Sequence, residues 1–134
     1  MLQLEVTLPC DSRAAALARR ALHGWRHELE PDVLDDLELL VSELIANSVR
    51  HSGHGKTKDI SLRASAEPEK VRVEVADAGA GFHHVRREPD PMETGGRGLY
   101  LVDILADRWG IKGDPNTCVW FELARSDERR PQPA

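Results

Sequence analysis

The sequence has little of what nucleic-acid binding would require. Its 134 residues include only three tryptophans, two phenylalanines and one tyrosine, too few for a surface on which single-stranded bases stack. Eighteen Lys and Arg residues against 23 Asp and Glu residues give a net charge of −5, which argues against a broad basic face for DNA or RNA. We therefore expect no direct nucleic-acid partner.

Cysteine and long apolar runs are also scarce. The two cysteines, Cys10 and Cys118, lie far apart without the spacing of a metal site, so we expect two reduced, partly buried thiols. No apolar run reaches the length of a membrane span, and the N-terminal residues lack the pattern of a signal peptide. These absences predict a soluble, cytoplasmic protein with no membrane partner.

What is present indicates one folded domain. Apolar residues make up 40% of the chain and charged residues 31%, which is enough to build a core in a chain of this length. Residues 125–134 carry charge and proline but nothing to bury, so we expect a disordered tail there. The domain is predicted to occupy residues 1–124.

The hydrophobic pattern predicts both strands and helices. Strands are expected where apolar residues alternate, and helices where they recur every three to four residues. In chain order the pattern predicts a strand at 2–8, helices at 14–29 and 31–50, a hairpin at 60–64 and 71–75, a helix at 98–106, and strands at 109–111 and 118–124. This order predicts an α+β fold: a two-layer α/β sandwich with a mostly antiparallel sheet and helices on one face.

Two polar residues on the second helix are the first candidates for chemistry. Glu43 and Asn47 are four residues apart, so their side chains project from one side of the helix, at the edge of its apolar stripe. The amide oxygen would suit a divalent metal, and the carboxylate could accept a proton from an attacking hydroxyl. The alternative is that both are ordinary residues at the boundary of the core.

Two glycine-containing segments are the other candidates. Asp77, Gly79 and Gly81 follow a strand, where the carboxylate could accept a hydrogen bond from an exocyclic amine; the alternative is a plain glycine-rich turn. Residues 95–99, Gly-Gly-Arg-Gly-Leu, open a helix whose N–H groups could hold phosphate. The segment is neither a P-loop nor a dinucleotide fingerprint, and taken alone it is a weak signal.

Together the three segments ELIANSVRH, DAGAGF and GGRGLYLV resemble the Bergerat ATP site of the GHKL superfamily. The resemblance covers roughly residues 1–124, as a histidine-kinase-like ATP-binding domain. The compact build and the ending NTCVWFEL look most like the stand-alone anti-sigma-factor serine/threonine kinases.

The resemblance implies a role for each matching residue. Glu43 would polarise the attacking hydroxyl, Asn47 would hold Mg²⁺ and Asp77 would bind the adenine amine of ATP. The remaining nucleotide contacts would come from Gly79, Gly81, Gly96, Arg97, Gly98, Leu99 and Thr117, and residues 82–94 would form a lid over the nucleotide.

The function that the resemblance implies is an ATP-dependent serine/threonine protein kinase. It would phosphorylate a small antagonist protein and bind a sigma factor, and so regulate transcription; a homodimer is expected from the resemblance alone. One alternative is a regulatory module whose partner affinity depends on bound nucleotide, without phosphotransfer. Another is a detached sensor-kinase domain that acts on a histidine. Retention of both Glu43 and Asn47 favours the enzyme, since a pure binding module needs no base.

Overall fold

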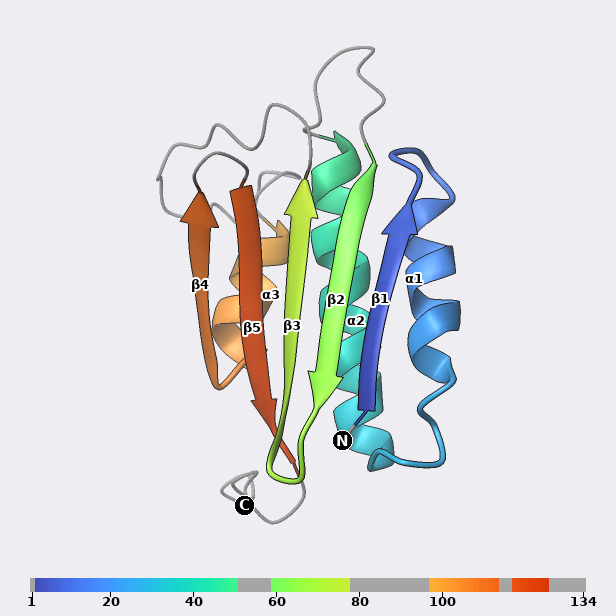
Figure 1. Ribbon diagram of the computed structural model, residues 1–134. Helices are drawn as coiled ribbons and strands as arrows, with labels where there is room; N and C mark the ends of the chain where they lie inside the picture. The colour runs from blue at the N-terminus through green and yellow to red at the C-terminus, as the bar shows by residue number, and fades with distance from the viewer. Residues whose placement is uncertain (1, 51–58, 78–96, 114–116, 126–134) are drawn as a thin grey trace.

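One antiparallel sheet carries the fold in the computed structural model, which describes residues 2–50, 59–77, 97–113 and 117–125. Within these residues the five strands lie in the order β1-β2-β3-β5-β4, and every neighbouring pair is antiparallel. Three helices lie behind the sheet and cover one of its faces (Figure 1). The bounds along the chain are β1 Leu2–Leu8, α1 Ala14–His23, α2 Pro31–Arg50, β2 Ile60–Ala66, β3 Lys70–Asp77, α3 Arg97–Leu105, β4 Arg108–Gly113 and β5 Thr117–Ala124. The predicted α+β sandwich is confirmed.

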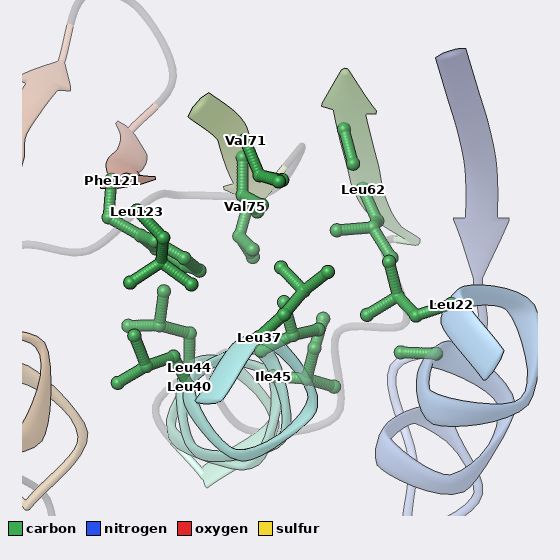
Figure 2. Close-up of a cluster of buried hydrophobic side chains, with 14 of the residues drawn as sticks. Leu22, Leu37, Leu40, Leu44, Ile45, Leu62, Val71, Val75, Phe121 and Leu123 are labelled. Carbon is green, nitrogen blue, oxygen red and sulfur yellow. The ribbon is translucent and has the colours of Figure 1, made fainter. Parts of the chain in front are cut away.

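The core lies between α2 and the sheet. The apolar stripe of α2 is fully buried, as its spacing predicts, and faces the inward side chains of β2, β3 and β5. Figure 2 shows the side chains that the two layers contribute to this packing. The helices contribute Leu22, Leu37, Leu40, Leu44 and Ile45, and the strands contribute Leu62, Val71, Val75, Phe121 and Leu123. Because α2 is held along most of its length, its polar residues are positioned with it.

The first helix is shorter than predicted. The pattern suggests a helix to residue 29, but α1 ends at His23, and the chain then runs through successive turns. Trp25 and Leu29, the last members of the predicted stripe, are nevertheless buried, because the turns return them to the core. Burial was therefore predicted correctly, and the helical extent was wrong.

Both cysteines are free and half-buried, as predicted. Burial raises the pKa of the Cys118 thiol, and the charge of Glu74 raises it further. Among the helices of the described residues, none combines the length and apolar character needed to span a membrane.

Arg125 is held firmly at the end of β5, although it is the first residue of the predicted tail. Its Nη1 donates to the carbonyl of Glu67 at 2.7 Å, its Nη2 to the carbonyl of Glu28 at 3.0 Å, and its Nε to the carboxylate of Glu30 at 3.4 Å. The side chain is only 16% exposed. It thus joins the β2–β3 turn to the segment before α2; residues 126–134 lie outside the described part of the chain.

Arg125→Ala should therefore lower the free energy of unfolding by about 2–3 kcal/mol, because it removes the charged donor that bonds the carbonyls of Glu28 and Glu67. Urea unfolding followed by circular dichroism measures this. Arg13→Ala is the matched control, since the exposed side chain of Arg13 bonds only to Asp11 among the residues described, and the substitution should change stability little. Equal losses in the two variants would contradict the role of Arg125.

Candidate functional site

The buried face of α2 turns polar in its last turns. Leu44 and Ile45 belong to the apolar stripe, but Asn47 and Ser48 continue the same buried face with an amide and a hydroxyl. Glu43 is half-buried, as its predicted position at the edge of the stripe implies, whereas Asn47 is buried, with 5% of its surface exposed; the chemical roles of the pair stay predictions. Ser48 was not singled out from the sequence, although its position four residues after Leu44 on the stripe was a signal for burial.

The amide oxygen of Asn47 is an unpartnered polar atom. Its Oδ1 is buried and accepts no hydrogen bond from the residues that the structure describes. Leaving such an acceptor unpaired costs about 1–3 kcal/mol, and buried polar atoms in proteins are nearly always satisfied. The atom is thus suited to an electropositive partner, either a cation or a donor on a ligand.

The amide oxygen of Asn47 is a suitable ligand for a Mg²⁺ ion that is bound together with phosphate. Mg²⁺ prefers hard oxygen ligands and is usually held by one or two protein oxygens, with water and substrate phosphates completing the shell. The described residues contain no cluster of three or more His, Cys, Asp and Glu side chains that could hold a metal by themselves. A single amide oxygen is compatible with a metal that a bound nucleotide helps to hold.

Glu43 lies on the same helix as Asn47. It lies one helical turn before Asn47, and no hydrogen bond or ion pair joins it to another residue within the described ranges. Glu38, on an earlier turn of α2, instead contacts His23 of α1, with 3.1 Å between Oε2 and Nδ1. The two glutamates of this helix thus have different environments: within the part of the chain that the structure describes, Glu38 has a side-chain partner and Glu43 has none.

Two other predicted residues, Asp77 and Thr117, lie at the end of the sheet where α2 also ends. β3 ends at Asp77 and β5 begins at Thr117, one residue beyond the register pair Ala76–Cys118 on these adjacent strands. In Figure 1 the end of α2, the end of β3 and the start of β5 all lie at the upper end of the molecule. The topology therefore brings Asp77 and Thr117 to neighbouring strand ends, beside the helix that carries Glu43 and Asn47.

The predicted phosphate-binding helix is observed with nearly the predicted bounds. α3 runs from Arg97 to Leu105, against a predicted 98–106, and it packs against α2. Its first turn contains Arg97, Gly98 and Leu99, so the free N–H groups and the positive dipole end lie there. Gly79, Gly81, Gly96 and the predicted lid at 82–94 fall outside the described residues, and the contacts assigned to them stay predictions.

Sequence comparison gives a family match and several relatives. The profile of the histidine kinase-like ATPase domain matches residues 8–123. The chain is 27% identical to serine-protein kinase RsbW of Bacillus velezensis and 29% identical to that of Bacillus subtilis, each alignment covering 94% of this chain and 88% of the relative. It is 26% identical to the anti-sigma F factor of Clostridium acetobutylicum, over 84% of this chain and 85% of the relative.

Solved structures share the fold. The chain superposes with a TM-score of 0.71 on the RsbU and RsbW domains of Rv1364c from Mycobacterium tuberculosis, covering 93% of this chain and 33% of that one. A histidine kinase domain from Erythrobacter litoralis gives a TM-score of 0.57, with 81% and 59% covered. Both are 22% identical to this chain in sequence, so these similarities show the fold alone.

Proposed function

Because the chain belongs to the histidine kinase-like ATPase domain family, we propose that it is a cytoplasmic serine/threonine protein kinase of the anti-sigma-factor type. It binds ATP with Mg²⁺ and transfers the γ-phosphate to a small antagonist protein. It also binds a sigma factor, so that exchange between these two partners acts as a switch. The names of its relatives, serine-protein kinase and anti-sigma F factor, support this choice within the family.

One observation carries the proposal: the buried Oδ1 of Asn47, one turn from Glu43, has no hydrogen-bond partner among the described residues. A module that only held adenine would not need a buried metal ligand next to an available carboxylate. In our proposal Asn47 holds Mg²⁺, which neutralises charge on the phosphates when bound. Glu43 orients the attacking hydroxyl and accepts its proton.

The remaining predicted residues bind the nucleotide. Asp77 accepts a hydrogen bond from the adenine amine, with Thr117 nearby on the adjacent strand. Gly79 and Gly81 let the base and ribose approach the backbone. The N-terminal turn of α3, with Arg97, Gly98 and Leu99, faces the phosphates together with Gly96.

The test is transfer of labelled phosphate from ATP to an antagonist protein, ideally one encoded beside this gene. We expect a phosphoprotein that survives acid, as phosphoserine and phosphothreonine do. An acid-labile product would favour transfer to histidine. A protein that binds ATP and antagonist together but transfers no phosphate would instead be a nucleotide-gated binding module.

Nucleotide choice tests the role of Asp77. ATP and ADP should bind well and GTP poorly, because guanine places a carbonyl where adenine has its amine, and two facing acceptors cost about 1–3 kcal/mol. Asp77→Asn should weaken ADP binding about 5- to 100-fold without unfolding the protein. Calorimetric titration of ATP, ADP and GTP measures both effects, and equal affinity for ATP and GTP would rule out this assignment.

A further inference from the structure

The uncovered face of the sheet is positively charged, in a protein whose net charge is −5. This face is turned toward the viewer in Figure 1, with the helices behind it. Among the described strand residues that point to it, five are cationic and three are acidic: Arg63, Lys70, Arg72, Arg108 and Lys112 against Glu5, Glu74 and Glu122. We call these eight residues, with Trp120, the basic face.

Two of the carboxylates lie beneath the cations. Arg72 donates to Glu122 and to Glu74, each at 3.1 Å, and the Glu122 side chain is only 9% exposed. Burial raises the pKa of Glu122, but hydrogen bonds from Arg72 and Lys70 outweigh it, so the pKa lies below its usual value. Glu122 is therefore ionised at neutral pH, and its charge is taken up within the sheet.

The outer cations keep free donors. Arg63 and Arg108 are 58% and 70% exposed, and their nearest carboxylate oxygens among the described residues lie at 3.6–3.7 Å, beyond hydrogen-bond distance. Both guanidiniums thus form only loose ion pairs with these carboxylates, and their N–H groups can still be offered to a ligand. A hollow of about 490 Å³ adjoins Arg63, between β1, β2 and β3.

Trp120 on this face contacts two arginines, Arg72 and Arg108. Trp120 pairs with Gly110 in the register of β4 and β5, and a Cβ at Gly110 would meet the indole Nε1 at 2.8 Å, so only glycine leaves room for the ring. The guanidinium of Arg72 stacks 4.4 Å from the ring centroid, and that of Arg108 lies at 6.0 Å. Tryptophan and arginine are enriched among the hot-spot residues of protein interfaces, which contribute most of the binding energy.

We propose that the basic face binds an acidic segment of a partner protein, whose carboxylates pair with Arg63 and Arg108 beside Trp120. Charge complementarity selects this occupant: among the exposed charges of the face, Arg63, Arg108 and Lys112 outnumber Glu5, and the less exposed Glu74 and Glu122 are already paired with cations of the sheet. A nucleic acid is disfavoured, because the chain as a whole is acidic and would repel a polyanion. The inference does not rest on the proposed kinase function, since the face is opposite to α2.

The probe is an octaglutamate peptide, titrated onto the whole protein by calorimetry and by tryptophan fluorescence. We expect binding that weakens with added salt and falls about ten-fold or more in the double variant Arg63→Glu/Arg108→Glu. Arg20→Glu/Arg26→Glu, which changes one exposed arginine on α1 and one in the turns that follow it, is the matched control with the same charge change, and it should bind the peptide far better than the first double variant. Trp120→Phe should remove the fluorescence response.

Other results would overturn the inference. These are equal losses in the two double variants, tighter binding of a dT20 oligonucleotide than of the peptide, or self-association in sedimentation that disappears with Arg63→Glu/Arg108→Glu. If that variant does not fold, Arg63→Gln/Arg108→Gln replaces it. ADP affinity, measured in parallel, should be unchanged in all variants. If the wild-type protein does not bind ADP, the proposed kinase function is contradicted, but the inference about the basic face is not.

Discussion

Glu43→Ala should reduce phosphotransfer to the antagonist by about 10²- to 10⁴-fold, while ATP and antagonist affinities change only a few-fold. A serine hydroxyl must lose its proton as its oxygen attacks the γ-phosphate, and a positioned carboxylate both orients the hydroxyl and accepts that proton. Glu43 is half-buried on a helix fixed by the core, so its position is well determined. Single-turnover transfer of labelled phosphate, beside a titration of ATP, measures the effect.

Glu38→Ala is the control on the same helix. Glu38 contacts His23 on α1 and is remote from the polar end of α2, so this variant should keep the wild-type rate. A Glu43→Ala protein that phosphorylates at the wild-type rate would leave the kinase in place but remove Glu43 from its mechanism. Equal rate losses in both variants would indicate damage to α2 and not to catalysis.

Most of the fold could be predicted from the sequence because its elements are strongly periodic. The stripe of α2 and the alternation in β2 and β3 each bury one side, which fixes both the element type and the face that packs inward. The end of α1 could not be predicted in this way. Trp25 and Leu29 keep the helical spacing of burial, but turns after His23 place them in the core.

The candidate site, like the fold, could be predicted only in part from the sequence. The four-residue spacing places Glu43 and Asn47 on one side of α2, and this was available from the sequence. That the Oδ1 of Asn47 lacks a partner depends on what packs around it, and so required the tertiary structure. The basic face was not predicted either, because the contacts of Arg72 and Trp120 depend on the register between β3, β5 and β4.

Asn47→Ala should weaken ATP binding at least about ten- to a hundred-fold in the presence of Mg²⁺ and only slightly in its absence. Even residues that merely orient a metal ligand cost this much in metal affinity when removed, and in our proposal Asn47 is itself a ligand. Binding without metal should survive, because the amide oxygen would contact the ion and not the base. Titrations of ATP with Mg²⁺ and with EDTA separate the two contributions.

Asn47→Asp is the informative control, because a carboxylate oxygen is also a hard ligand for Mg²⁺ and should keep the metal-dependent part of the affinity. Stability adds a second readout. Since Oδ1 has no protein partner in the described residues, its removal breaks no hydrogen bond of its own, and urea unfolding of the metal-free variant should show no loss attributable to that atom. Equal losses of ATP affinity with Mg²⁺ and with EDTA would instead make Asn47 a structural residue, and the buried oxygen would then require a partner other than a metal.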